Sequence, residues 1–334
     1  MIKAEIQQQT IPADTPPLVS VIIPAYNAAK YIGEALNSVF DQTCRSHESI
    51  VINDGSPDTV ELERELQAYR GTLQYIKQDN RGAAAARNAG LRCARGEYVA
   101  FLDADDRWLP NFLEEQIQFL KINNADFVFS DALLFGETPL AGRTFMELEP
   151  PKGAVTPESL LAVEVAVLTS AVLARKQPIL EVGLFDETIK RGHDFELWFR
   201  LAKAGVRFAY QPRVLAEHRI VESGLSGNAL SQLYRTLSVL EAVKAKGTLT
   251  QSEAAALNLN VRRTQGALAL ESGKEKLLVR DFEGALESLN EARRYRPTLK
   301  LRLASFGVKI APETVRRPYQ RRTGARKWLK DREA

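Results

Sequence analysis

The stretch Tyr98-Val-Ala-Phe-Leu-Asp103-Ala-Asp105-Asp106 is the part of the sequence around which the remaining motifs are organised. Its apolar run ends in three acids within four positions, a pattern typical of a buried strand that carries carboxylates to its own C-terminal end. Burying so much negative charge is costly without a cation. A divalent metal suits the site, because carboxylate oxygens are preferred ligands of Mg²⁺ and Mn²⁺. The alternative is a surface turn after a strand, since Asp is also a common turn residue.

A unit of one strand, one loop and one helix recurs along the first part of the chain. Strands are predicted at residues 18–23, 49–53, 73–77 and 98–102, and helices at 32–40, 59–69, 83–94 and 110–122. Strands and helices that alternate at this spacing predict an α/β fold with a doubly wound, mostly parallel sheet. The loops after the strands then open on one edge of the sheet, where such folds bind their ligands.

The pattern is less regular after residue 123. Strands are predicted at 127–129 and 169–174, with a loop-rich connection at 137–153. Apolar residues at helical spacing from Phe195 onward predict a further helix, which ends at Gly205. Asp194 would then lie at a helix N-terminus, where the helix dipole stabilises an ionised carboxylate. The alternative is that Asp194 only caps the helix.

The charge is divided unevenly along the 334 residues, although the net charge is only +3. Residues 1–228 carry 23 Lys and Arg against 31 Asp and Glu, whereas residues 229–334 carry 22 against 11. An acidic part joined to a basic part indicates different partners for the two. We expect a flexible leader at 1–17, an α/β domain at 18–227, a helical extension at 228–315 and a basic tail at 316–334. Within the extension, residues 266–292 resemble one tetratricopeptide-like hairpin.

The basic tail combines its Lys and Arg residues with Tyr319 and Trp328, a composition that favours an anionic membrane surface over nucleic acid. A solvated tail is the alternative. Cys44 and Cys93 stand far apart and outside any CxxC pattern, which argues against a disulfide framework or a zinc site. Neither a secretory signal nor a membrane-spanning run is recognised. We therefore expect a cytoplasmic protein, with peripheral attachment to the inner face of the membrane as an option.

Five separated motifs follow one another in the chain. They are Val19-Ser-Val-Ile-Ile-Pro-Ala-Tyr-Asn27, Val51-Ile-Asn-Asp-Gly-Ser56, Asn80-Arg-Gly82 with Ala86-Arg-Asn-Ala-Gly90, Gly96-Glu-Tyr98 with Asp103-Ala-Asp-Asp106, and Gly183-Leu-Phe-Asp-Glu187 with His193-Asp194. In this order and spacing they resemble the family 2 inverting glycosyltransferases, which have the GT-A fold. The resemblance covers residues 18–226 and does not extend in the same way to the helices beyond.

The resemblance implies transfer of a sugar from a nucleotide-sugar donor, a UDP-sugar by default, to an acceptor hydroxyl. It further implies a glycan or a lipid-linked acceptor, a role in the assembly of surface polysaccharide or another glycan, and Mn²⁺ or Mg²⁺ as cofactor. By similarity, the residues of the site are Ala25 and Tyr26 beside the base, Asp54 hydrogen-bonded to the base, Arg87 on the nucleotide, Asp103 near the ribose and the metal, Asp105 on the metal, and Asp194 as catalytic base. Asp106 would have a supporting role in the turn.

These residue types suit the implied reaction. The leaving nucleoside diphosphate gains negative charge as the glycosidic bond breaks, and a divalent metal stabilises that charge. The acceptor hydroxyl is a poor nucleophile at neutral pH, so a carboxylate must take its proton. Single displacement with one base inverts the anomeric centre.

The sequence departs from the family pattern at two positions. His193 stands where the family usually has Glu, and Val221 stands where a histidine often reaches the metal. His218, which precedes Arg219, is left out of the metal site as a structural histidine. His193 is the one feature that favours a competing function, a non-catalytic sugar-nucleotide-binding or scaffold protein. The sequence does not determine the donor sugar, the linkage or the oligomeric state.

Overall fold

The computed structural model describes residues 6–7, 16–220, 229–247 and 249–322. The chain divides into two compact units, Met1–Gly224 and Leu225–Ala334. Among the residues that the structure describes, no helix is both long and apolar enough to cross a membrane.

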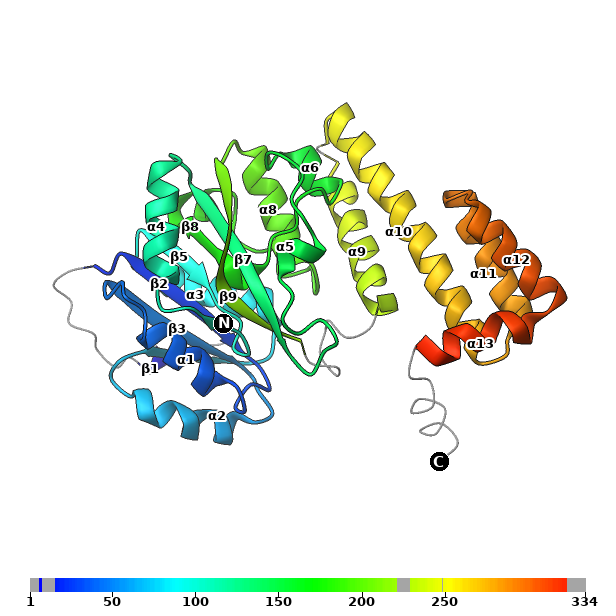
Figure 1. Ribbon diagram of the computed structural model, residues 1–334. Coiled ribbons are helices and arrows are strands. Elements are labelled where there is room, and N and C mark those ends of the chain that lie inside the picture. The colour runs from blue at the N-terminus through cyan, green and yellow to red at the C-terminus, as the bar shows by residue number, and fades with distance from the viewer. Residues whose placement is uncertain (1–5, 8–15, 221–228, 248, 323–334) are drawn as a thin grey trace. The chain divides into compact units, whose positions relative to one another are not determined.

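One mixed sheet organises the first unit (Figure 1). Its described strands are β1 Ile6–Gln7, β2 Val19–Ala25, β3 His47–Asp54, β4 Gln74–Gln78, β5 Tyr98–Phe101, β6 Arg107–Trp108, β7 Phe127–Gly136, β8 Val172–Arg175 and β9 Phe208–Ile220. Across the sheet their order is β1-β4-β3-β2-β5-β8-β7-β9-β6. Strands β4, β3, β2 and β5 pair in parallel, β8 is antiparallel to both β5 and β7, and β9 is parallel to β7. Six of the nine described strands therefore run in one direction, which confirms the mostly parallel sheet.

Helices cover both faces of this sheet, as a doubly wound fold requires. The helices of the first unit are α1 Ile32–Phe40, α2 Thr59–Glu65, α3 Ala83–Cys93, α4 Phe112–Ile122, α5 Phe145–Leu148, α6 Pro157–Leu161, α7 Lys176–Glu181 and α8 His193–Lys203, with 3₁₀-helices η1 Leu66–Tyr69 and η2 Thr169–Ala171. Helices α1, α2 and α4 bury their apolar faces in one core, and α3, α6, α7 and α8 in the other. Strand β2 separates the cores, because Val21 and Ile23 face the first and Ile22 faces the second.

Close approach of α3 to the sheet explains why this helix is rich in small residues. A Cβ atom on Gly90 would lie 2.6 Å from the Ile22 side chain, so a larger residue would push the helix away. A Cβ atom on Gly96 would lie 2.6 Å from the backbone nitrogen of Ser20. These two glycines therefore set how closely the chain packs around β2.

Some local features differ from the sequence predictions. Strand β9 was not predicted, because Pro212 interrupts its pattern at an irregularity of the β7–β9 pairing. Asn27, although of a residue type that often caps helices, does not cap α1, since Tyr31 is the N-cap and Asn27 has a positive φ of 52°. The loop-rich connection at 137–153 contains the short helix α5.

The second unit is helical, as predicted. Its helices are α9 Ala229–Ala245, α10 Gln251–Leu278, α11 Phe282–Tyr295, α12 Leu299–Ile310 and α13 Pro312–Arg322. Helices α10 and α11 pack antiparallel, because Gly266 lies against Tyr295 whereas Gly273 lies against Leu289. The expected hairpin is thus a pair of packed helices, and its likeness to a tetratricopeptide repeat stays a prediction.

The predicted leader and tail are described only in part. Two leader residues, Ile6–Gln7, form β1 and pair antiparallel with β4. Within the tail, Arg316 is buried and pairs with Glu313 at 2.8 Å, so its charge is satisfied inside the second unit. The side chains from residue 318 onward, including those of Tyr319 and Trp328, lie outside the described residues.

Candidate active site

The acidic stretch follows β5 at the carboxyl edge of the parallel strands. The Asp103 N–H donates to the Ser170 hydroxyl at 3.1 Å, and the Asp106 N–H donates to the Asp103 carbonyl at 3.0 Å. These bonds fold the three acids into a turn against the end of the sheet. The location is the one expected from the alternating pattern, since ligands of such folds bind beyond the carboxyl ends of the strands.

Asp105 lies in a concentration of negative charge. Burial, together with the Asp106 and Asp103 charges, raises the pKa of Asp105 to about 7. A carboxyl group with so high a pKa is destabilised in its ionised form, and a nearby cation would reverse that destabilisation. The environment of Asp105 therefore fits a cation site.

Asp106 has a different role, because it is buried and joins the acidic turn to β9. It accepts from the Arg219 N–H at 2.8 Å and from His218 Nδ1 at 3.1 Å. Burial alone would lower the pKa of His218, but the Asp106 carboxylate raises it to about 9. Because Nδ1 of His218 is hydrogen-bonded to the Asp106 carboxylate, this pair links the acidic turn to β9. Val221 lies outside the described residues.

Arg87 connects the acidic turn with the start of α8. It projects from α3, where it is buried, and donates from Nη2 to Asp103 Oδ1 at 2.5 Å. It also donates from Nη1 to His193 Nε2 at 2.6 Å. A guanidinium is planar and presents its donors in a fixed fork, so one side chain can orient two partners at once. Arg87 thereby holds Asp103 and His193 in one network.

Asp194 lies in the first turn of α8, next to His193. The helix begins after Gly192, whose φ of 77° favours glycine, and Asp194 Oδ1 accepts from the Phe195 N–H at 2.9 Å. Burial alone would raise the pKa of Asp194, but the Arg87 charge opposes that effect. Hydrogen bonds from the Phe195 N–H and the Thr169 hydroxyl act in the same direction, so the pKa of Asp194 lies below its ordinary value. Asp194 is consequently ionised at neutral pH.

The short helix η2 provides a second link between Asp103 and Asp194. The Thr169 hydroxyl donates to Asp194 Oδ2 at 3.0 Å, while the neighbouring Ser170 hydroxyl accepts from the Asp103 N–H. Asp103 and Asp194, ninety-one positions apart, therefore belong to one site. The sequence pattern does not indicate Thr169 and Ser170 as site residues, because it predicts the start of a strand where the structure has η2.

The loops after β2, β3 and β4 lie at the same edge. Asp54 is buried and accepts from the Arg81 N–H at 3.0 Å and the Gly82 N–H at 2.7 Å, so it fixes the loop that leads into α3. Ala25 is buried at the end of β2, whereas Tyr26 beyond it is 54% exposed. The residues expected at the nucleotide thus surround the carboxyl edge, with a buried carboxylate and an exposed aromatic ring among them.

Two of the sequence motifs contact each other directly. Asn88 of α3 donates to the Phe185 carbonyl at 2.9 Å and accepts from the Phe185 N–H at 3.0 Å. Glu187 accepts from Asn88 at 3.0 Å and pairs with Arg81 at 2.5 Å. These contacts fix the segment that precedes α8 against α3. They explain why the motifs around residues 86–90 and 183–187 accompany the acidic residues.

The donor atoms of Asp103 and Asp105 suit a hard divalent cation. In the described part of the chain, no group of three or more His, Cys, Asp or Glu side chains is arranged to hold a metal ion. Two carboxylates are nevertheless enough for Mg²⁺, which usually takes its other ligands from water and from the phosphates of a bound substrate. The residues present therefore fit a metal that binds together with a phosphorylated ligand.

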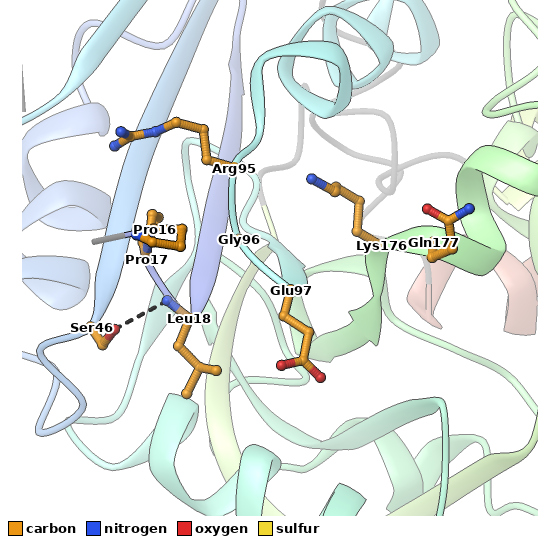
Figure 2. A pocket seen from close by; sticks show the side chains of 9 residues that line it. All are labelled: Pro16, Pro17, Leu18, Ser46, Arg95, Gly96, Glu97, Lys176 and Gln177. Atoms are coloured by element: carbon orange, nitrogen blue, oxygen red, sulfur yellow. Dashed lines mark hydrogen bonds between the residues drawn. The ribbon is translucent and has the colours of Figure 1, made fainter. Parts of the chain in front are cut away.

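A hollow of about 600 Å³ at the opposite edge of the sheet is separate from this site (Figure 2). It lies where β2, β3 and β5 begin, and Leu18, Ser46 and Glu97 are among its lining residues. Its Arg95 is paired with the buried Glu48 at 2.9 Å. None of the predicted site residues lines this hollow, so the carboxyl edge remains the candidate active site.

Comparison with known proteins agrees with the motifs. The family model described as Glycosyl transferase family 2 matches residues 20–145. The putative teichuronic acid biosynthesis glycosyltransferase TuaG of Bacillus subtilis is 31% identical over 245 residues, which are 70% of this chain and 94% of that protein. The Escherichia coli enzyme named UDP-Glc:alpha-D-GlcNAc-diphosphoundecaprenol beta-1,3-glucosyltransferase WfgD is 28% identical over 67% of this chain and 85% of its own length.

A solved structure shares the fold over nearly the whole chain. The mannosyltransferase PcManGT of Pyrobaculum calidifontis, in complex with GDP-Man and Mn²⁺, superposes with a TM-score of 0.62 at 20% identity and covers 95% of this chain and 86% of its own. Relatives from Rickettsia are longer, and the chain spans between 27% and 32% of the length of three of them. The mixed α/β architecture is that of the GT-A glycosyltransferases, and the chain belongs to glycosyltransferase family 2.

Proposed function

We propose that the chain is a metal-dependent inverting glycosyltransferase that moves a sugar from a nucleotide-sugar donor to an acceptor hydroxyl. The observation that carries this proposal is the network that joins Asp103 to Asp194 through Arg87 and His193 and again through η2. This network places two carboxylates in one site. Asp103 is suited to a cation that also binds phosphate, and Asp194 is suited to deprotonate a hydroxyl. Both roles are needed for displacement of a nucleoside diphosphate.

On the donor side, the proposal assigns each residue by its surroundings. Tyr26 offers an exposed ring on which a base can stack, and Asp54 holds the loop that borders the base. With Asp103 Oδ1 engaged by Arg87, the proposal assigns Oδ2 to the ribose or the metal. Asp103 and Asp105 would hold Mn²⁺ or Mg²⁺, which when bound stabilises the charge that develops on the leaving diphosphate.

On the acceptor side, Asp194 is the proposed general base. Its lowered pKa keeps it ionised, and the hydrogen bonds from Thr169 and Phe195 fix the orientation of the carboxylate. A fixed, ionised carboxylate can take the proton of an acceptor hydroxyl as that oxygen attacks the anomeric carbon. No covalent intermediate is needed, so the transferred sugar inverts its configuration.

Relatives support a place in surface polysaccharide assembly. The printed names of two of them refer to teichuronic acid biosynthesis and to a UDP-glucose donor with a diphosphoundecaprenol-linked acceptor. We therefore propose a UDP-sugar as default donor and a glycan or lipid-linked acceptor. With a lipid-linked acceptor, the reaction would take place at the cytoplasmic face of a membrane.

The test is a donor panel with the purified full-length chain. UDP-glucose, UDP-N-acetylglucosamine and GDP-mannose are each added with Mn²⁺, with Mg²⁺ or with EDTA, and thermal shift and donor hydrolysis are measured. We expect one nucleotide class to raise the melting temperature only with metal and to release its sugar slowly. If no nucleotide binds in the presence of metal, the proposal fails. Metal-dependent binding without any turnover, even with candidate acceptors, would favour the non-catalytic binding protein.

A further inference from the structure

Helix α12 has apolar side chains on two opposite faces, and only one of these faces is packed in the core of the described second unit. The inner face packs Leu301, Ala304 and Val308 into the small core that α12 shares with α10, α11 and α13. The outer face carries a row of four large apolar residues, which we call the outer ridge: Leu299, Leu303, Phe306 and Ile310. A helix that is apolar on both faces is expected to bury both of them.

The outer ridge is exposed along its whole length. The four residues are 71%, 61%, 63% and 65% exposed, in chain order. Single exposed apolar residues are common on proteins, but these four recur at spacings of four, three and four positions. At about 100° per residue they fall within an arc of about 60° on the helix surface. They form one continuous stripe rather than scattered positions, and a stripe of this kind marks an interaction surface.

The charged residues of α12 beside the outer ridge are all basic. On the helical projection, Lys300 lies on one side of the ridge and Arg302 and Lys309 lie on the other, and all three are exposed. Residues 299–310 contain no acidic side chain. A narrow apolar stripe between two basic borders is the pattern of a helix that lies in a membrane interface, where the apolar side chains enter the acyl boundary and the cations meet anionic headgroups.

We propose that α12 docks on the surface of an anionic membrane through the outer ridge. An identical copy of the chain fits this surface less well. A two-fold contact between outer ridges would bring the basic borders of two copies together, and like charges at close range oppose association. Residues 229–334, with 22 Lys and Arg against 11 Asp and Glu, add a long-range attraction to anionic lipid. The inference is independent of the transfer reaction, because it uses no residue of the candidate active site.

The proposal differs from docking through the basic tail. It places the contact on Leu299–Ile310, where the apolar residues supply affinity that salt does not screen and the basic residues supply selectivity for anionic lipid. A tail that acted only through charge would release at high salt and would not depend on Leu303 or Phe306.

The experiment is vesicle flotation with the full-length chain. Vesicles of phosphatidylcholine are compared with vesicles of phosphatidylcholine and phosphatidylglycerol, at low and at high salt. The variant L303S/F306S removes the centre of the outer ridge, and the variant K300Q/R302Q/K309Q removes its borders. The matched controls are L259S on α10 and I122S on α4, which alter apolar residues that are 46% and 82% exposed elsewhere.

We expect the wild-type chain and both controls to float with anionic vesicles and to float much less with neutral ones. The ridge variant should lose about tenfold or more of its partitioning at either salt concentration. The burial of one Leu or Phe side chain alone changes the partition coefficient by about that factor. The border variant should lose its preference for anionic lipid. Circular dichroism should show the wild-type helix content in all variants, because the altered side chains are exposed.

Two results would overturn the proposal. Flotation of the ridge variant equal to that of the wild type would assign any binding to the tail or to another surface. A change from dimer to monomer in the ridge variant, without a change in flotation, would assign the outer ridge to a contact between copies of the chain.

Discussion

Arg87 and His193 stand 106 positions apart in the sequence and are joined by a hydrogen bond of 2.6 Å from Nη1 to Nε2. A guanidinium can only donate, so His193 must be neutral and accept with Nε2. Burial and the Arg87 charge lower the pKa of His193 to about 4, which agrees with that state. The neutral His193 thus keeps Arg87 directed at Asp103. Unlike the Glu that the family usually has at this position, it adds no negative charge beside Asp194.

This neutral histidine should make the fold sensitive to acid. In the unfolded chain, His193 gains a proton as the pH falls below about 6.5, whereas the folded chain resists protonation down to about 4. The unfolded state therefore binds more protons in this window, and stability declines as the pH falls through it, by at most about 3 kcal/mol. The variant H193Q should show a smaller loss of melting temperature between pH 7 and pH 5 than the wild type. An equal loss in both proteins would exclude His193 as the cause.

Loss of Asp105 should weaken nucleotide binding that depends on metal. The variant D105N keeps the size of the side chain but removes the charge that a bound cation needs. We expect the affinity for UDP with Mn²⁺, measured by calorimetry, to fall about tenfold or more, with little change in EDTA. The variant E147Q, on the exposed surface of α5, serves as a charge-matched control. Unchanged affinity in D105N would remove Asp105 from the metal site.

Loss of Asp194 should separate binding from transfer. In D194N the contacts to Thr169 and Phe195 involve an amide rather than a carboxylate, and no base is left for the acceptor hydroxyl. Turnover should fall about 100-fold to 10,000-fold, whereas donor affinity with metal stays within about threefold of the wild type. A variant that retains wild-type turnover would show that another group takes the proton.

The packing of Gly96 predicts a large effect on stability from a single methyl group. In G96A the new Cβ atom would lie 2.6 Å from the Ser20 nitrogen and 2.8 Å from the Tyr98 carbonyl oxygen, and both are backbone atoms that cannot turn aside. We expect a loss of about 1–3 kcal/mol in the free energy of unfolding, measured with urea. In G33A, within α1, the nearest atom is 3.9 Å away, so the same change should raise stability by about 0.5–1 kcal/mol. Equal effects at the two positions would contradict the steric argument.

Local patterns in the sequence were sufficient for most of the first unit. The strands β2, β3 and β5 are marked by short runs of apolar residues, because buried parallel strands are apolar on both faces. The position of Asp194 at the start of α8 followed from the helical spacing that begins at Phe195. Strand β9 could not be predicted, because Pro212 interrupts its strand pattern. The order β5-β8-β7 could not be predicted either, because no local pattern in the sequence shows which strands pair in the sheet.

The sequence by itself determined most of the elements that form the sheet, the edge at which the acidic turn opens and the residue types available there, since these depend on short-range periodicity and on motifs. Only the tertiary structure decided how the acids differ. Asp103 is held by Arg87, Asp106 is bound to β9, and Asp105 is left where burial and like charge raise its pKa. Such differences arise from partners far away in the chain, whose positions are set by packing of the whole sheet. The same packing decided which face of α12 is buried and left the outer ridge exposed.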